Sequence, residues 1–355
     1  MKGENMHNVH NLKDEQLQRL KDVVAKQKKP WAILVAQVDP DALGSAFGLR
    51  LALTGLGVKH QDITIFYGGE IGHAQNKMLI NRFGLLDAKF LSVSKCFDPA
   101  KFAVALVDSS QEVDGRFGQV ELKPVIVIDH HRGATVSQTE DTFVWVEDIG
   151  AASTLIVELL VSLKVDIKEA ERAVGPLLAV GIHNDTHGLT AGTTARDLAA
   201  FAHVHANIET QEFSRCCTFP RSPAHFDNKL RALERRKVKS ACLVTNIGTV
   251  TNGDADDIAT IADDFISCDG ISLVVVWCII GKKVRISARN TDATRDLGAF
   301  LRERFGPSCG AKVTDTGGGI GGGLLELDLG QWMIPEVREE IEALVDKFIC
   351  AKMQA

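Results

Sequence analysis

Aspartate and histidine side chains follow four separate segments of this sequence, three of them short apolar runs. The residues are Asp39, Asp41, Asp108, Asp129, His130, His131 and Asp185. Carboxylate and imidazole ligands without a thiolate suit Mn²⁺, Mg²⁺ or Fe²⁺ better than a structural zinc ion. A set of acids in which one member can bridge two ions is typical of a two-metal site of the phosphoesterase type. The residue types therefore predict such a site, provided that the four segments meet.

Each of these side chains also has an ordinary structural interpretation. An aspartate after a strand is often a turn residue or a helix cap, and Asp41 taken alone is equally well explained as a cap. Asp108 precedes two serines and is no more informative, and histidines are more often structural than ligands. Four such caps on four segments, one carrying an Asp-His-His triplet, would be a coincidence. A shared metal site is therefore the favoured hypothesis.

Short apolar runs predict the elements that must position these residues. WAILVAQV, DITIFYGG, FAVALVD and PVIVID alternate with helical segments, and this pattern is typical of a parallel sheet with helices on both faces. The carboxyl ends of parallel strands lie at one edge of a sheet, where ligand sites gather. We therefore expect an α/β fold with the acids at that edge.

The length of 355 residues predicts two domains. We expect a metal-binding domain over residues 1–205, beginning with a helix from Asn11 to about Gln27, and a connector over 206–228. Residues 229–355 would form a smaller α/β domain that ends in a C-terminal helix.

Composition limits the function further. The net charge of −6 and an aromatic content of 6% argue against a surface that coats long nucleic acid. The eight cysteines show no CxxC spacing and predict free thiols in a reducing compartment. The N-terminus lacks the apolar core of a signal peptide, and no apolar run reaches membrane-spanning length. We expect a cytoplasmic protein without a membrane partner.

Four of these stretches resemble, in order, the motifs of the DHH phosphoesterases. VDPDALGSA is similar to the first motif, VDSS to the second, IDHHRG to the third and GIHNDTHGL to the fourth. VRISARN and TDTGGGIGGG are similar to the substrate-binding strand and the glycine-rich loop of the DHHA1 domain. Within the family, the chain looks closest to the bacterial nanoRNase and pAp-phosphatase proteins, which are often called exopolyphosphatase-related.

The resemblance implies two divalent metal ions, with Mn²⁺ preferred and Mg²⁺ as the alternative. One ion would bind Asp39 and Asp108. The second ion would be held by Asp41, Asp108, His130 and Asp185, with Asp108 bridging the two ions. The ions would lower the pKa of a bridging water, which would attack phosphorus in line with the leaving group.

The resemblance also implies roles beyond the metal ligands. Asp129 would orient the histidine pair, and His131 would face the phosphate. In the second domain, Ser287 and Arg289 lie two residues apart on a predicted strand, so their side chains share a face. The Arg289 guanidinium would bind a substrate phosphate, although an exposed arginine at a sheet edge is an equally common finding. The backbone amides of a glycine-rich loop would cradle an anion, at Gly317, Gly318 and Gly319.

Two positions depart from the family pattern. The first motif usually has a histidine four residues before its first aspartate, and Val35 stands there. Gln37, His183 and His187 are candidate replacements for this histidine. The glycine-rich loop usually ends in a histidine, and Ile320 replaces it.

The sequence thus predicts a metal-dependent phosphohydrolase of short oligoribonucleotides or of small nucleotides such as 3′-phosphoadenosine 5′-phosphate. Pyrophosphate, polyphosphate and cyclic dinucleotides are alternative substrates within the same chemistry. A nucleotide-binding regulatory protein with a degenerate site is the alternative of another class. A homodimer is compatible with each of these functions. A basic run, interpreted as a cleft wall or as a solvated helix face, comprises Lys229, Arg231, Arg235, Arg236, Lys237 and Lys239.

Overall fold

The computed structural model describes residues 9–69, 71–118, 121–131, 133–168, 171–314 and 317–354. The chain divides into two compact units, Met1–Phe219 and Pro220–Ala355. This division falls within the segment 206–228 that the sequence analysis assigned to a connector. Two helices occupy that segment and its border: α8 (Thr210–Cys217) closes the first unit, and α9 (Pro223–Arg235) opens the second.

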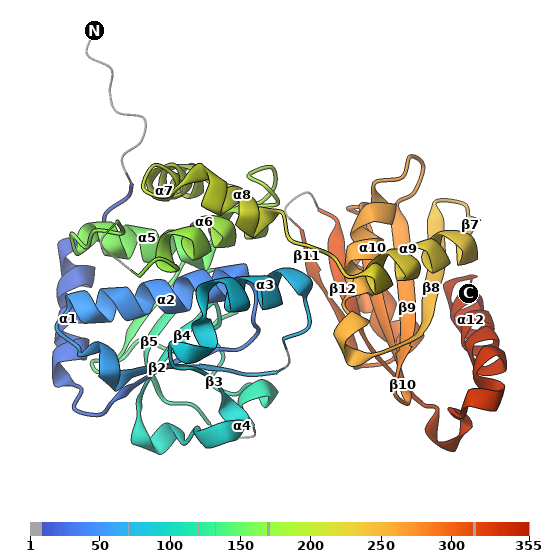
Figure 1. The fold of residues 1–355 in the computed structure, drawn as a ribbon, viewed down its shortest axis with the longest axis horizontal. Coiled ribbons are helices and arrows are strands. Elements are labelled where there is room, and N and C mark those ends of the chain that lie inside the picture. The colour runs from blue at the N-terminus through green and yellow to red at the C-terminus, as the bar shows by residue number, and fades with distance from the viewer. Residues whose placement is uncertain are drawn as a thin grey trace, which may run out of the picture. The chain divides into compact units, whose positions relative to one another are not determined.

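The first unit is built on a six-stranded sheet in the order β3-β2-β1-β4-β5-β6. Every neighbouring pair is parallel, as the sequence predicted (Figure 1). The strands are β1 (Trp31–Val35), β2 (Ile63–Tyr67), β3 (Phe90–Ser92), β4 (Ala103–Val107), β5 (Pro124–Asp129) and β6 (Phe143–Val146). Because β1 and β4 are central and wholly buried, their sequences are continuously apolar rather than alternating.

Long helices cover one face of this sheet. They are α1 (Asp14–Lys26), α2 (Pro40–Gly55), α3 (Ala74–Phe83), α5 (Ala152–Ser162), α6 (Val174–Asp185) and α7 (Ala195–His205). Their apolar sides share one core with the side chains of β1 that point to the same face, Trp31, Ile33 and Val35. The helix α1 begins later than predicted, at Asp14, because the Gln16 side chain accepts a hydrogen bond from the Lys13 backbone amide and starts the helix there.

The opposite face of the sheet is covered by short segments and not by the expected layer of helices. Leu34 and Leu106 point to this face and pack with Phe117 and Leu122, which lie in short turns and loops. The four-residue helix α4 (Val93–Cys96) lies on the same side (Figure 1). The α/β class is confirmed, and the two faces of the sheet differ in how they are covered.

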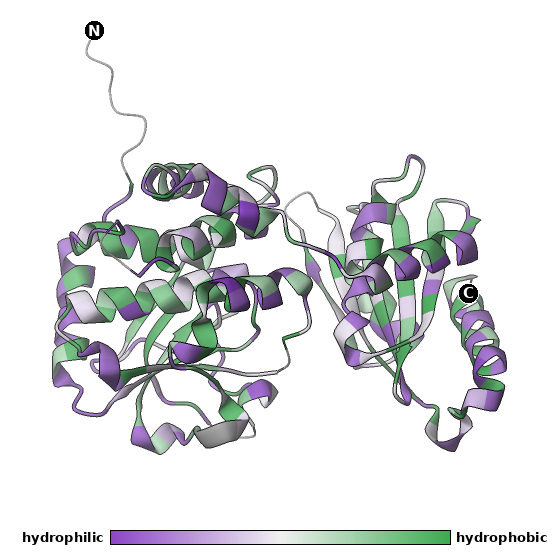
Figure 2. Cartoon of the chain, in the orientation of Figure 1, coloured by the Kyte–Doolittle hydropathy of each residue, from purple (hydrophilic) through white to green (hydrophobic). Residues whose placement is uncertain are grey.

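The second unit has its own six-stranded sheet, in the order β11-β12-β10-β9-β8-β7. Its strands are β7 (Lys237–Lys239), β8 (Cys242–Val250), β9 (Leu273–Ile280), β10 (Lys283–Asn290), β11 (Cys309–Val313) and β12 (Gly319–Asp328). The β8–β9 pair is parallel and the other pairs are antiparallel. The central strand β9 is largely apolar and mostly green in Figure 2.

Helices cover both faces of this second sheet. The helices α9 and α10 (Asp257–Ile266) pack on one face. The helices α11 (Leu297–Phe305) and α12 (Arg338–Gln354) pack on the other. Among the described helices of the whole chain, none combines the length and apolarity needed to cross a membrane.

The glycine run expected to form a loop is mostly a strand. Gly319 begins β12, which pairs with β10 and β11, and Gly317 and Gly318 precede it. A Cβ atom on Gly322 would lie 2.3 Å from the Ile286 carbonyl oxygen, so only glycine allows this approach of the neighbouring strand. The prediction of a loop was therefore wrong for Gly319. Asp315 and Thr316 of this run, and Arg132 of the third motif, lie outside the described residues.

Candidate metal centre

The carboxyl ends of three adjacent strands bring the predicted acids to one edge of the first sheet. The strands β1, β4 and β5 are neighbours, and they lead into Asp39, Asp108 and Asp129 respectively. Asp185 ends α6, which packs beside α2 on the same side of the sheet (Figure 1).

Asp39 and Asp41 have different environments. Asp39 is the N-cap of α2, and its Oδ1 accepts a hydrogen bond of 2.9 Å from the Ala42 amide. Asp41 lies inside the first turn of the helix, so Asp39 rather than Asp41 is the cap. Pro40 explains the difference, because its fixed φ favours the first helical position.

Asp41 is fully buried at the start of a second helix. Its two carboxylate oxygens accept hydrogen bonds of 2.7 Å and 2.8 Å from the backbone amides of Ala152 and Ser153, in the first turn of α5. The N-terminus of a helix stabilises a negative charge. These two amides were missed by the sequence analysis, because nothing in the local sequence links α5 to a residue about 110 positions earlier.

His130 lies at the centre of the acids. Its Nε2 is 3.3 Å from Asp108 Oδ1, 3.5 Å from Asp185 Oδ2 and 3.8 Å from Asp41 Oδ2. Its Nδ1 lies 3.1 Å from the carbonyl oxygen of Ile149. A carbonyl can only accept, so the proton is assigned to Nδ1, and in the neutral ring the lone pair of Nε2 faces the carboxylates.

This arrangement leaves buried polar atoms without hydrogen bonds. Within the described part of the chain, His130 Nε2 and Asp108 Oδ1 are buried and have no hydrogen-bond partner. Such groups are costly unless a ligand satisfies them. A divalent cation fits, because a lone pair and several carboxylate oxygens then point at one positive charge.

Among the described residues, two groups of side chains are close enough to hold a metal ion. The first group is Asp41, His130 and Asp185, and the second is Asp108, His130 and His131. The ligand atoms within each group all lie within 4.8 Å of one another. His130 is common to both groups, whereas the resemblance implied Asp108 as the bridge. Asp39 belongs to neither group, so its role as a ligand stays a prediction.

The electrostatics show how much negative charge is crowded into this site. Burial and the nearby Asp108 raise the pKa of Asp41 to about 6. Burial, with Asp41 next, holds the pKa of Asp185 well above its usual range. Burial alone would lower the pKa of His130, but Asp108 and Asp41 raise it to about 10. A cation bound among these groups would relieve the same repulsion.

Asp129 and His131 form a positioned pair beside these groups. Asp129 is fully buried, and its Oδ1 accepts hydrogen bonds from the amides of His130 and His131 and, at 2.8 Å, from His131 Nδ1. Burial would raise the pKa of Asp129, but the hydrogen bond from His131 outweighs it and the pKa is lowered. Asp108 has a positive φ of 53°, a conformation that costs energy for a non-glycine residue and is common at functional sites.

Val35 and the candidate replacements for the missing histidine have different environments. Val35 is fully buried in the core under the long helices. Gln37 is exposed, and its Oε1 accepts a hydrogen bond from Arg116. The residues His183 and His187 lie in neither metal-binding group. The ring of His183 packs against Phe213 of α8.

Comparison with known proteins now gives the family of this domain. Residues 32–182 match the DHH family, N-terminal domain. This range contains six of the seven predicted acids and histidines, and Asp185 lies just beyond it. This part of the chain belongs to the DHH family. The match covers β1 to most of α6, which are the elements that carry the candidate metal centre.

Individual relatives extend the comparison. An uncharacterized protein of Methanocaldococcus jannaschii is 28% identical over 341 residues, which are 94% of this chain and 66% of that protein. A probable manganese-dependent inorganic pyrophosphatase of Thermotoga maritima is 30% identical over 115 residues, which are 32% of this chain and 20% of that protein. The chain thus spans just under two thirds of the first relative and a fifth of the second.

A solved structure shares the fold of both units. An exopolyphosphatase-related protein from Bacteroides fragilis superposes with a TM-score of 0.66 over 96% of this chain and 98% of that chain. The two sequences are 14% identical, so this likeness shows the fold alone.

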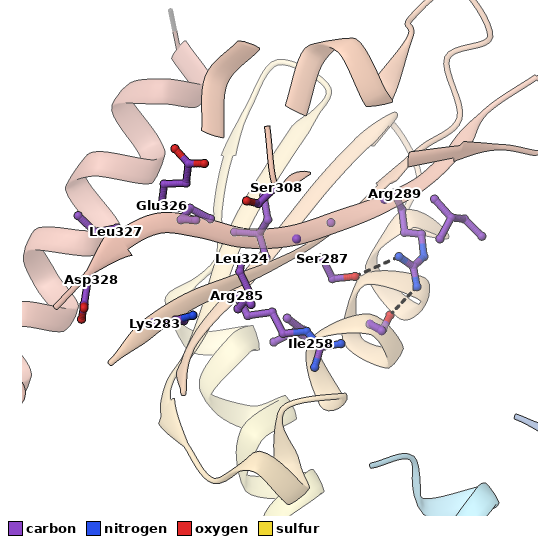
Figure 3. A pocket seen from close by; sticks show the side chains of 17 residues that line it. Ile258, Lys283, Arg285, Ser287, Arg289, Ser308, Leu324, Glu326, Leu327 and Asp328 are labelled. Carbon is purple, nitrogen blue, oxygen red and sulfur yellow. Dashed lines mark hydrogen bonds between the residues drawn. The ribbon is translucent and has the colours of Figure 1, made fainter. Parts of the chain in front are cut away.

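Beyond the DHH domain, the second unit contains the predicted substrate residues beside a cavity of about 740 Å³. Ser287 and Arg289 lie on one face of β10, as predicted, and Arg289 donates a hydrogen bond of 3.1 Å to Ser287 Oγ (Figure 3). Gly321, Gly322 and Gly323 line the cavity, and Gly317, Gly318 and Gly319 are not among its lining residues.

Arg289 is already fully engaged within its own unit. Its side chain makes a two-pronged ion pair with Asp263 of α10. It also donates to Ser287 Oγ and to the carbonyl oxygens of Ala288 and Ala259. These contacts use all five N–H donors of a guanidinium. As it stands in the structure, Arg289 therefore has no donor left for a substrate phosphate.

Arg285 lines the same cavity and is less engaged. Its side chain is 40% exposed and makes one ion pair, at 2.9 Å from Nη1 to Asp256. Lys283 also lines the cavity, two residues earlier on the same face of β10 (Figure 3). Arg285 was not among the predicted substrate residues, although its spacing from Ser287 places it on that face.

The basic run beginning at Lys229 is mostly neutralised by neighbours. Lys229 pairs with Asp264 at 2.8 Å, Arg235 with Glu342 at 3.0 Å, and Lys237 with Asp346. These contacts favour a solvated, paired surface over a continuous track for a phosphate backbone.

Proposed function

We propose that this chain is a metal-dependent phosphohydrolase of the DHH family that acts on short oligoribonucleotides or small nucleotides. One observation supports the proposal most strongly: His130 Nε2 is buried among three carboxylates without a hydrogen bond. The groups Asp41, His130, Asp185 and Asp108, His130, His131 are two overlapping places where a divalent ion would bind, and the one lone pair of His130 Nε2 serves one ion at a time. Mn²⁺ is the preferred ion in this proposal.

The bound ions supply the chemistry of lowering the pKa of a water molecule and of neutralising phosphate charge. The chain supplies the geometry. Asp129 accepts from His131 Nδ1 and so orients the ring, and in the doubly protonated ring Nε2–H is the donor that would meet a phosphate oxygen. Ile149 fixes the ring of His130 in the same way. These contacts hold both imidazoles in one orientation before substrate binds.

The second unit supplies the proposed recognition of the substrate. In the cavity lined by Ser287, Arg285 and Lys283, two cationic side chains and a hydroxyl can meet a phosphate. We assign this contact to Arg285 in preference to Arg289, because Arg289 has its donors occupied. The low aromatic content gives no stacking platform for a long single strand, which favours a short ligand.

Pyrophosphate and cyclic dinucleotides remain alternative substrates of the same centre, and the pyrophosphatase relative is the reason to include the former. The alternative of another class is a regulatory protein that binds nucleotides without turnover. Its motivation is Val35, which leaves the centre one imidazole short of the family pattern. We also propose that the protein is cytoplasmic and forms a homodimer.

A screen with Mn²⁺ tests the proposal. We would measure phosphate release and oligonucleotide shortening with oligoribonucleotides of two to five units, 3′-phosphoadenosine 5′-phosphate, pyrophosphate and a cyclic dinucleotide. Asp108→Ala should lose at least about 10³-fold in rate, roughly 4 kcal/mol of barrier. Asp22→Ala, on the exposed side of α1, is the matched control and should keep the wild-type rate. Nucleotide binding without Mn²⁺-dependent turnover of any substrate would favour the regulatory protein instead.

A further inference from the structure

A second cavity, of about 400 Å³, lies on the face of the second sheet that α11 and α12 cover. Its floor comes from β7, β8 and β9. Lys237 pairs with Val244 and Lys239 with Cys242 across the β7–β8 ladder, and Cys242 pairs with Leu273 of β9. Residues directly paired in a sheet project to the same face, so the two lysines stand beside an apolar floor.

This cavity is distinct from the one that holds Arg285. On β10, Lys283, Arg285, Ser287 and Arg289 alternate with Val284, Ile286 and Ala288. The apolar set packs into the core beneath α11 and α12, so the basic set points to the opposite face. Anions bound in the two cavities would therefore lie on opposite sides of one sheet.

Four cations converge on the second cavity. Lys237 and Lys239 come from β7, Arg295 from the turn before α11, and Arg304 from α11 itself. No acidic side chain is among its described lining residues. Asp346 pairs with Lys237, and Asp292 lies 3.9 Å from Arg295, but both acids stand outside the lining.

Arg304 is held in place but is not saturated. Its guanidinium lies 4.5 Å above the Phe300 ring, and its Nη1 donates a hydrogen bond of 2.5 Å to the Lys352 carbonyl oxygen. Its Nε is buried and has no hydrogen-bond partner among the described residues. A donor left unpaired in a buried position costs stability unless a ligand accepts from it. This contrasts with Arg289, whose five donors are all used.

Apolar side chains complete the cavity. Val244 and Leu273 form the floor, and Phe300 and Met353 form walls from α11 and α12. The volume lies within the range of small-molecule pockets, roughly 300–1,000 Å³. A ligand that satisfies both parts of the wall needs an anionic group and an apolar or aromatic body.

We propose that this cavity is a second ligand site, which binds a small phosphorylated molecule with an aromatic body, of the size of a nucleoside monophosphate. Arg304 and Lys239 meet the phosphate, and the Phe300 and Met353 walls contact the aromatic body. The site is independent of the metal centre and of the Arg285 cavity.

Thiol protection tests the site directly, because Cys350 is a partly exposed lining residue and Cys268 is exposed outside the cavity. The probe is the non-hydrolysable phosphonate analogue of adenosine monophosphate, added to the full-length, Mn²⁺-loaded protein. We expect it to slow modification of Cys350 by N-ethylmaleimide at least about tenfold at saturation and to leave Cys268 unchanged. Adenosine and inorganic phosphate, which each lack one half of the ligand, should protect only at much higher concentration.

Variants decide whether the named cations carry the binding. Arg304→Ala and Lys239→Glu should each raise the concentration needed for protection by about tenfold or more, the loss expected for a charged hydrogen bond. Lys239 is exposed on the edge strand, so Lys239→Glu tests the site without disturbing the core. Arg285→Ala is the control for the other cavity and should leave protection unchanged.

Equal modification of Cys350 with and without the probe would overturn the proposal, as would protection that survives both Arg304→Ala and Lys239→Glu. Neither result bears on the hydrolase proposal, which is measured separately by Mn²⁺-dependent turnover in the Asp108→Ala comparison.

Discussion

The candidate metal centre of the DHH domain and the Arg289 cluster of the second unit differ in how their charged groups are satisfied. Around His130, acids crowd together, and the buried atoms His130 Nε2 and Asp108 Oδ1 are among those with no hydrogen-bond partner in the described part of the chain. Around Arg289, every donor of the guanidinium is used. Unsatisfied buried groups mark a place prepared for a ligand, whereas a saturated charge is part of the scaffold. The contrast predicts which substitutions damage function and which damage stability.

The largest effect should come from His130→Ala, because this side chain belongs to both metal-binding groups. We expect Mn²⁺ affinity to fall and turnover to fall at least about 10³-fold, roughly 4 kcal/mol of barrier. Asp39→Ala is the comparison, since Asp39 lies in neither group and caps α2. Asp39→Ala should lose about 1 kcal/mol of stability through the missing cap. Its loss of activity should be smaller than that of His130→Ala. Calorimetric Mn²⁺ titration and turnover measure both, and equal losses in the two variants would contradict the grouping.

The next effect separates two arginines on one strand. Arg285→Ala should raise KM for a nucleotide substrate about 10- to 100-fold, as expected for a lost charge-assisted contact, while the melting temperature stays close to wild type. Arg289→Ala should mainly lower the stability of the second unit, because Asp263 and Ser287 lose their shared partner. Steady-state kinetics and thermal unfolding of both variants give the answer. A rise in KM confined to Arg289→Ala would show that Asp263 releases this arginine to the substrate.

The same two regions show what the sequence can and cannot predict. The ends of β1, β4 and β5 were predictable, because continuous apolar runs identify buried parallel strands and parallel strands share a carboxyl edge. The Asp-His-His triplet then indicated the centre and its family.

The contacts that set the properties of each residue come from distant parts of the chain. The amides of Ala152 and Ser153 lie 111 and 112 residues from Asp41, and Asp263 lies 26 residues from Arg289. No local pattern encodes such pairings. The resemblance to a glycine-rich loop predicts a loop here, whereas the close approach of Gly322 to β10 exists only after the sheet has formed.

A third prediction concerns pH and metal together. Asp41 has a pKa raised to about 6, and His130 a pKa raised to about 10. In both cases the metal-free folded state binds more protons than the unfolded state, between about pH 4 and 6 for Asp41 and between about 6.5 and 10 for His130. Stability of the metal-free protein should therefore fall as pH rises through these windows.

Bound Mn²⁺ replaces those protons, so the stabilisation by the ion should grow with pH. We expect the difference in melting temperature with and without saturating Mn²⁺ to be larger at pH 8 than at pH 6, by about 2–4 °C for each 1 kcal/mol of added stabilisation. His130→Ala is the control and should show a small difference at both pH values. A difference that shrinks as pH rises would contradict the charge balance assigned to the centre.

The smallest effect comes from a paired acid in the first unit, which should respond to pH in the opposite direction. Glu212 of α8 accepts two hydrogen bonds from Arg82 and one from Arg172, and its side chain is 9% exposed. The hydrogen bond from Arg82 is the main cause that lowers the pKa of Glu212 to about 2. Because the folded pKa lies below the unfolded value of 4.5, this cluster stabilises the fold above about pH 4.5 and loses that contribution as pH falls towards 2. The shift corresponds to about 3 kcal/mol at most, and access of solvent to Arg172 reduces it to about 1–2 kcal/mol.

Denaturant unfolding of wild type and Glu212→Gln at pH 7 and pH 3.5 measures the contribution. We expect the variant to be less stable than the wild type at pH 7 and this difference to narrow at pH 3.5, because Glu212 is then mostly protonated in the unfolded chain. A gap that stays constant between the two pH values would assign the role of Glu212 to packing rather than to charge.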